Sequence, residues 1–237
     1  EAALHCRLTT SPKTVALLPD IVTGATSADS HVVAAAIKAC RQILSKETSP
    51  PIAEVISAGL VHVMVDVLNS SSGTAVVATD CFDGMAHKTE VNTTMVDAAW
   101  ALTNIASGDT AATQAVIDAG AIPIFVELLG SSHAPLADQV AWALGNLAGN
   151  GSTARDQVLE ARALPQLLAL LSSPATPTPM MRNITWTISN LCRGKVPRPT
   201  FDAVAAAVPA LCALVHTASD GDTEVTTDAA WALSYLT

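Results

Sequence analysis

The stretch DTAATQAVIDAGAIPIFVELLGSSHAPLADQVAWALGNLAG, residues 109–149, decides the fold. Its first part, DTAATQAVIDAG, predicts a short helix. Asp109 or Thr110 can cap the start of this helix with a side-chain oxygen. Gly120 can follow its last turn, where a left-handed backbone is common.

Two more helices are predicted in the same stretch. AIPIFVELLG, residues 121–130, places Pro123 in a first turn, where the missing N–H does no harm. SSHAP then predicts a turn. LADQVAWALGNLAG, residues 136–149, predicts a third and longer helix that ends at Gly149.

The same pattern returns elsewhere in the chain. Copies of the second helix occur in ISAGLVHVMVDVLNSS at 56–71, ARALPQLLALLSS at 161–173 and AAVPALCALVHTA at 206–218, with Arg162 where a glycine is expected. Three helices in about 42 residues is the armadillo arrangement, in which each unit buries its apolar faces only by stacking on the next. We therefore predict an all-α protein, a right-handed armadillo-repeat solenoid of three-helix units.

We expect a single armadillo domain over residues 1–237, with one irregular insertion. Gly59 lies 41 residues before Trp100, whereas Gly120 lies 22 residues before Trp142. The extra residues fall within 70–94, which is either an extended surface loop or a divergent stretch of helix. The units are placed at approximately 11–69, 70–130, 131–173, 174–218 and, in part, 219–237.

All four tryptophans of the chain recur in register, 42, 44 and 45 residues apart (100 to 142, 142 to 186 and 186 to 231). Each has a polar residue four positions later and another three positions earlier. On a helix these positions share one face. The resulting stripe consists of Asp97, Trp100, Asn104, Gln139, Trp142, Asn146, Asn183, Trp186, Asn190, Asp228, Trp231 and Tyr235.

A single tryptophan at helical spacing is usually a core residue, but four in register with polar flanks favour an exposed row on the inner curve of the solenoid. The first unit has Lys38 and Gln42 in the places of tryptophan and asparagine, as terminal units are often atypical. An indole face holds the aliphatic stem and the cationic head of lysine or arginine. An asparagine amide both donates and accepts, and so fits an extended peptide backbone. With a net charge of −9, the chain is expected to bind an extended segment rich in Lys and Arg.

Five segments resemble the armadillo domain of the importin-α family: ILSKETSPPIAEVISAGL at 43–60, WALTNIASG at 100–108, WALGNLAG at 142–149, RNITWTISNLCR at 182–193 and WALSYLT at 231–237. The resemblance implies an adaptor that binds nuclear localisation signals of cargo proteins, works with importin-β and shuttles between cytoplasm and nucleus. It implies neither an enzyme activity nor a cofactor.

The resemblance also assigns roles to individual residues. The four tryptophans would form slots for cationic side chains, and the asparagines at 104, 146 and 190 would hold the peptide backbone, together with Gln139 and Asn183. Tyr235 stands where the family also has tyrosine. Ser107, Gly108 and Thr113 would surround the most deeply bound lysine.

One residue departs from the family pattern. Where the family completes the deep lysine pocket with an aspartate, this chain has Asn150. A charge-assisted hydrogen bond then becomes a neutral one, which is weaker by about 1 kcal/mol. Either affinity is lower, or Asp109 or Asp156 compensates.

We expect the chain to be a fragment, because it begins without methionine and stops at Thr237 inside a helical pattern. The family's basic N-terminal segment, which binds importin-β, is not present in this sequence. The later repeats, which hold the minor site for bipartite signals, lie beyond Thr237. Such a fragment should favour monopartite signals, since avidity from a second site is missing.

Other classes of protein fit less well. An armadillo scaffold of the β-catenin type shares the helices but lacks regular tryptophans and tends to have a basic groove. An enzyme has little support, because the six histidines are scattered and no HExxH occurs. Five cysteines without a CxxC pair indicate a reduced intracellular protein. The acidic charge argues against direct nucleic-acid or membrane binding.

Overall fold

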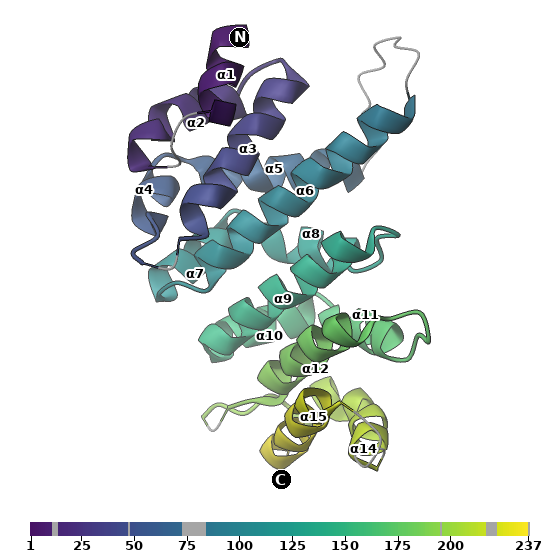
Figure 1. The fold of residues 1–237 in the computed structure, drawn as a ribbon. Coiled ribbons are helices and arrows are strands. Elements are labelled where there is room, and N and C mark those ends of the chain that lie inside the picture. The colour runs from purple at the N-terminus through teal and green to yellow at the C-terminus, as the bar shows by residue number, and fades with distance from the viewer. Residues whose placement is uncertain (11–13, 47, 73–83, 195, 217–221, 237) are drawn as a thin grey trace. The chain divides into compact units, whose positions relative to one another are not determined.

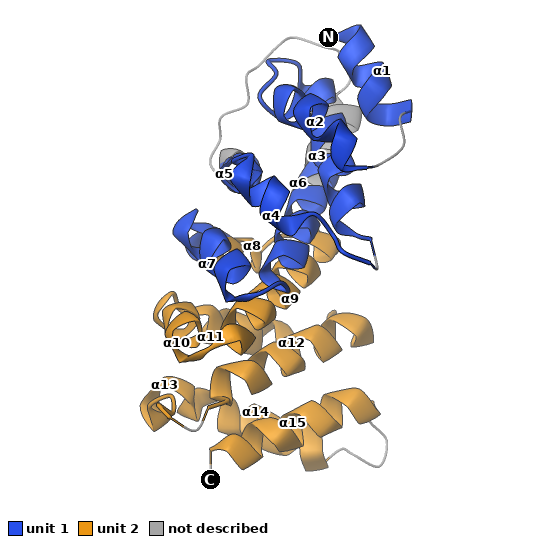
Figure 2. Cartoon of the chain, turned by 90° about the vertical axis from the view of Figure 1, so that its left-hand side faces the viewer, with its two compact units in different colours: residues 1–124 blue, residues 125–237 orange. Residues whose placement is uncertain are grey.

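The computed structural model describes residues 1–10, 14–46, 48–72, 84–194, 196–216 and 222–236. These residues form helices and connecting loops with no strand among them, which confirms the predicted all-α class. The chain divides into two compact units, residues 1–124 and 125–237, which Figure 2 colours separately and which are described one at a time.

Unit 1 is built around α3 and α6, which pack against each other, while α2 packs on α3 and α5 packs on α6. The chain order can be followed in Figure 1. The elements of this unit are α1 (Ala2–Thr10), η1 (Val15–Leu17), α2 (Leu18–Ala25), α3 (Ser30–Leu44), α4 (Ile52–Ser57), α5 (Leu60–Ser72), α6 (Gly84–Ala106) and α7 (Thr110–Asp118). The next helix, α8 (Ala121–Leu128), crosses the boundary between the units.

Unit 2 is built around three long helices that lie side by side, with α12 in contact with both α9 and α15 (Figure 1). Shorter helices pack on this layer. The elements are α9 (Ala134–Asn150), α10 (Ser152–Glu160), α11 (Ala163–Leu171), α12 (Thr178–Cys192), α13 (Phe201–Val204), η2 (Ala205–Ala207), α14 (Val208–His216) and α15 (Thr223–Tyr235).

The helix signals at 109–149 are confirmed, with corrections at the helix bounds. Helix α8 ends at Leu128, and α9 begins at Ala134 inside the predicted SSHAP turn, because Pro135 is tolerated in a first turn. The Asp109 carboxylate accepts a hydrogen bond of 2.8 Å from the Ala112 N–H and caps α7. The expected end of the third helix at Gly149 is wrong by one residue, because α9 continues to Asn150 and Gly151 is the first residue outside it. Glycine is a weak helix former, yet one glycine near a helix end does not stop a helix that packs on its neighbours.

The residue before the second helix of a unit adopts a left-handed backbone in three places. Gly59 and Gly120 have φ of 74° and 78°. Arg162 occupies the same place with φ of 67°. The sequence pattern aligns Arg162 with these glycines and so predicts the position of this residue. A left-handed backbone is energetically unfavourable for a residue that has a Cβ atom.

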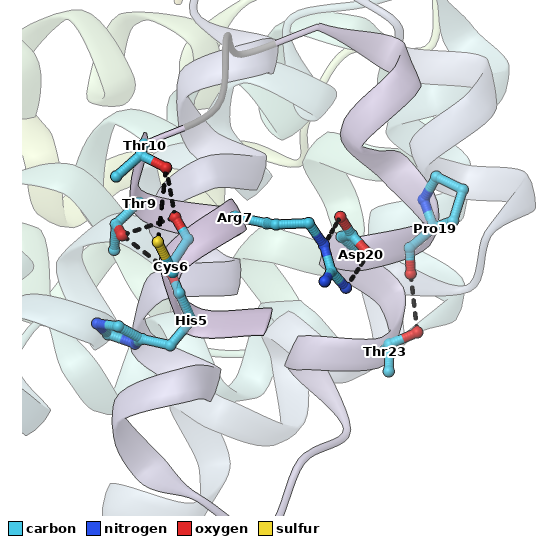
Figure 3. Close-up of polar contacts among 8 residues, drawn as sticks. All are labelled: His5, Cys6, Arg7, Thr9, Thr10, Pro19, Asp20 and Thr23. Carbon is cyan, nitrogen blue, oxygen red and sulfur yellow. Dashed lines mark hydrogen bonds and ion pairs between the residues drawn. The ribbon is translucent and has the colours of Figure 1, made fainter. Parts of the chain in front are cut away.

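Helices α1 and α2 are joined by a bidentate ion pair (Figure 3). The Arg7 Nε donates to Asp20 Oδ2 at 2.9 Å and its Nη2 donates to Oδ1 at 3.0 Å. The hydrogen bond from Arg7 lowers the pKa of the Asp20 carboxyl below its usual value. Because the pair is exposed, it orients α1 against α2 more than it stabilises the unit.

Residues 70–94, expected as an irregular insertion, are described only in part. Helix α5 reaches residue 72 and α6 begins at residue 84, so the described backbone on both sides is helical. Residues 73–83 lie outside the described residues, as does Cys81.

The core positions fix the direction of the tryptophan side chains. Two positions after each of three tryptophans lies a fully buried aliphatic residue: Leu102 on α6, Leu144 on α9 and Ile188 on α12. Since two positions differ by about 200° around a helix, burying these side chains turns the indoles away from the core.

Candidate peptide-binding site

Three of the four tryptophans are exposed, as the stripe predicts. The exposed fractions are 41% for Trp142 and 56% for Trp231 in unit 2, and 38% for Trp100 in unit 1. Trp186 is partly exposed. In unit 2 the three indoles come from α9, α12 and α15, whose packing places them in successive positions of one layer.

Trp186, on α12, packs against the backbone of α9. A Cβ built on Gly145 would collide with the Trp186 ring and would also meet Thr187 Oγ1. The Thr187 hydroxyl donates a hydrogen bond of 2.9 Å to the Ala141 carbonyl oxygen. Helices α9 and α12 therefore approach closely here because residue 145 has no side chain, and the ring lies over that gap.

The asparagines do not form one uniform row. Asn183 is half-buried and donates from Nδ2 to Asp138 Oδ1 at 2.8 Å. Gln139 and Asn146 are also half-buried. The expected exposure is wrong at Asn190, which is 5% exposed. Its Nδ2 donates to the Gly145 carbonyl oxygen at 3.1 Å, so α9 already satisfies part of this amide.

The last helix of the stripe, α15, carries two aromatic rings. Trp231 and Tyr235 stack with ring centres 6.1 Å apart and planes at 25°. Asp228, one turn before Trp231, is half-buried, and burial followed by repulsion from Glu224 raises the pKa of its carboxyl. Thr223, Glu224, Thr227 and Asp228 line an open hollow of about 290 Å³. Two carboxylates in such a hollow attract a cation, although Glu224 already pairs with Arg182 Nη1 at 3.5 Å.

Glu224 was not identified from the sequence stripe. Its spacing of four residues from Asp228 was the available signal, because it places both carboxylates on one face of α15.

An ion pair holds α15 to α12. The Arg182 Nη2 donates to Asp222 Oδ2 at 2.7 Å, and Asp222 Oδ1 also accepts from the Glu224 and Val225 N–H groups at the start of α15. The hydrogen bond from Arg182 is the main reason that the pKa of Asp222 is lowered. This contact fixes the helix that carries Trp231.

Asn150 is the last residue of α9 and is half-buried. The two carboxylates considered as replacements for the missing charge have partners of their own. Asp156 accepts from Arg155 Nε at 2.8 Å, and Asp109 caps α7. A bound lysine would therefore share either carboxylate with the partner that it already has.

In unit 1, Trp100 is covered on one face by a side chain of the protein itself. The Arg41 guanidinium carbon lies 4.5 Å from the centre of the Trp100 ring. The Arg41 Nε lies 2.6 Å from Asp97 Oδ1, and the two side chains are only 16% and 12% exposed. Burial raises the pKa of the Asp97 carboxyl, although the charges of Arg41 and Lys38 oppose the shift.

The other predicted residues of unit 1 lie around the end of α6. Asn104 is half-buried and donates from Nδ2 to Ser45 Oγ at 3.2 Å. Ser107 is exposed and Gly108 is half-buried. Thr113, expected at the deep lysine pocket, is 1% exposed, and its hydroxyl donates to the Ala106 carbonyl oxygen at 3.1 Å. This hydroxyl therefore joins α7 to α6 in the structure.

The parts of the chain that the structure describes hold no cluster of three or more His, Cys, Asp and Glu side chains that could bind a metal. Within the same residues, no single helix is long and apolar enough to cross a membrane. The pair α7 and α8 reaches the required length only jointly, with a bend of 77°.

Comparison with known proteins identifies the repeats. The Armadillo/beta-catenin-like repeat family matches residues 109–149, 154–193 and 198–237, which make up just over half of the chain. The solved structure of a designed armadillo repeat protein in complex with the peptide (KR)4 superposes with a TM-score of 0.76 at 24% identity, covering 100% of this chain and 92% of that one. The predicted armadillo-repeat solenoid is thereby confirmed.

Curated relatives place the chain more narrowly. Importin subunit alpha-1a of Oryza sativa subsp. japonica is 44% identical over 219 residues, which is 92% of this chain and 37% of the relative. Importin subunit alpha-B of Dictyostelium discoideum is 46% identical over 220 residues, which is 92% of this chain and 38% of the relative. The chain thus spans well under half the length of these relatives. It belongs to the armadillo/β-catenin-like repeat family, and within that family it resembles the importin-α subunits.

Proposed function

We propose that this chain is the cargo-binding part of a nuclear import adaptor. It binds Lys- and Arg-rich nuclear localisation signals in an extended conformation along the row of tryptophans and asparagines, for transport with importin-β between cytoplasm and nucleus. The observation that carries the proposal is the exposure of indoles at equivalent places of successive third helices in a chain of net charge −9. The similarity to importin-α subunits supports the same role.

The described geometry supplies the chemistry that such a ligand needs. Indole faces pack along the methylene stems of lysine and arginine and attract their charges by about 0.5–1 kcal/mol each when exposed. The Asp228 carboxylate, one helical turn before Trp231, lines an open hollow and adds attraction for a cation. The designed armadillo protein with bound (KR)4 demonstrates that this fold can carry such a peptide.

A fluorescence titration tests the proposal. A short Lys- and Arg-rich peptide should change the tryptophan emission and bind with a dissociation constant below about 100 µM at moderate salt. A peptide of the same length with glutamate in place of the cations should not bind. Preference for the acidic peptide would instead favour a β-catenin-like scaffold, and absence of any binding would refute the adaptor role.

Trp142→Ala is the matching variant. We expect a folded protein with about tenfold weaker peptide binding, because one indole contributes both packing and cation attraction. Phe201→Ala is the control, since Phe201 is also an exposed aromatic residue and lies on α13, outside the row. Equal effects of the two variants, or unfolding of Trp142→Ala alone, would contradict the proposed site.

A further inference from the structure

Arg41 makes with Trp100 and Asp97 the contacts that a lysine or arginine of a cargo peptide would be expected to make. The Arg41 guanidinium carbon lies 4.5 Å from the centre of the Trp100 ring. Arg41 also pairs with the carboxylate of Asp97, which lies three residues before Trp100 on α6. An aromatic face together with an acid is a general site for a cation. At Trp100 this site is filled from within unit 1.

No other third helix supplies a cation at the equivalent place. Arg41 lies three residues after Lys38, which takes the place of a tryptophan. The residues three positions after the four tryptophans are Thr103, Gly145, Ser189 and Ser234, none of which carries a charge. Among the four tryptophans, only Trp100 therefore has a cation of the preceding third helix at this place.

Unit 2 shows the contrasting arrangement at Trp231. Asp228 and Trp231 repeat the spacing of Asp97 and Trp100, but Asp228 faces an open hollow. Glu224 also lines this hollow and is paired with Arg182, whose Nη1 lies 3.5 Å from Glu224 Oε1. An acid and an indole at the same helical spacing are thus covered by Arg41 in unit 1 and open to a ligand in unit 2.

Building on the proposed function, we propose that Arg41 is a built-in cation that ends the row of peptide slots at Trp100. It takes the ring face that a cargo lysine or arginine would otherwise use, and the exposed Lys38 beside it repels further cations. Arg41 is then a specificity determinant. Basic residues of a cargo that extend past Trp100 gain no affinity from this ring face.

The test compares peptides with and without an added cation. A Lys- and Arg-rich core peptide is extended at either end, once with lysine and once with alanine, and the ratio of the two affinities is measured for each end. For the unmodified chain we expect ratios near one at the end that reaches Trp100. In Arg41→Gln the freed indole and the Asp97 carboxylate should raise the ratio at that end about fivefold.

Arg7→Gln is the matched control, because it removes the same charge from an ion pair that involves no residue of the row. It should leave both ratios as in the unmodified chain. If Arg41→Gln does not fold by circular dichroism, the double variant Arg41→Gln with Asp97→Asn removes the unpaired carboxylate, and a ratio raised about twofold is expected from the indole alone.

The outcomes separate the two hypotheses. Core-peptide binding with unchanged ratios in the Arg41 variants would overturn the role of Arg41 and leave the adaptor proposal standing. A core peptide that fails to bind even the unmodified chain would overturn the adaptor proposal itself.

Discussion

Trp100 in unit 1 and Trp186 in unit 2 occupy the same place in their helices, yet their rings meet different neighbours. Trp100 lies under the guanidinium of Arg41, whereas Trp186 lies over the bare backbone of Gly145. Arg41 and Gly145 are themselves equivalent positions of the preceding third helix. The repeat motif thus sets where each indole is, and one residue of the preceding helix sets what that indole can still bind.

The largest expected effect comes from giving Gly145 a side chain. In Gly145→Ala the new Cβ collides with the Trp186 ring, so α9 and α12 must separate or the ring must move. We expect a loss of about 2 kcal/mol in the free energy of unfolding, measured with urea, even though alanine favours the helix.

Gly149→Ala is the control for this variant. It lies one turn further along α9, where the nearest atom to a new Cβ is Asn190 Nδ2 at 3.2 Å, a much smaller overlap than the one at Gly145. It should cost less than half as much. Equal stability of the two variants would show that the ring does not rest on Gly145.

The second test compares two asparagines of the row. Asn190→Ala removes a buried amide that donates to the Gly145 carbonyl oxygen, and should lower the free energy of unfolding by about 1.5 kcal/mol. Asn104→Ala removes a half-buried amide that contacts Ser45, and should cost less than about 0.5 kcal/mol. Both are measured by urea unfolding. Equal costs would mean that the two units do not differ in this respect, and the reverse order would contradict the structural role of the Asn190 amide.

Much of the fold could be predicted, because its signals are local. Asp109 caps the helix that it precedes, and Gly120 takes a left-handed backbone after that helix. Even Arg162, the exception among the glycines, was marked by its alignment with them. The end of α9 was missed by one residue, since packing on a neighbouring helix decides how long a terminal turn persists.

Less of the site could be predicted, because its contacts join residues far apart in sequence. The exposure of the indoles followed from their spacing against the buried positions. The contact of Arg41 with Trp100 did not, since it joins two helices that are far apart in the sequence. The burial of Asn190 depends likewise on the absence of a side chain at Gly145, which a pattern within one helix does not reveal.

A third, smaller effect concerns the residue that departs from the family pattern. Asn150→Asp restores a carboxylate at the end of α9, and should strengthen binding of a Lys-rich peptide about fivefold through a charge-assisted hydrogen bond. The same charge at a helix C-terminus should lower the free energy of unfolding by about 0.5 kcal/mol.

Titration of the Asn150→Asp chain with peptide measures the first effect. Gln157→Glu, which adds one negative charge on α10, is the control for net charge. An equal gain in both variants would mean that position 150 has no special contact with the ligand.

The smallest effect is a pH dependence that differs in sign between two acids of unit 1. Burial raises the pKa of Asp97, so its contribution to stability is complete below its ordinary pKa near 3.8 and is lost as the pH rises through the higher value in the folded chain. Arg7 lowers the pKa of Asp20, so that contribution is present above 3.8 and is lost as the pH falls. Unfolding free energies measured against pH for Asp97→Asn and Asp20→Asn, each relative to the unmodified chain, should therefore slope in opposite directions. Slopes of the same sign would indicate that the Arg41 charge outweighs the burial of Asp97, and that the pKa of the carboxyl beside Trp100 is lowered instead of raised.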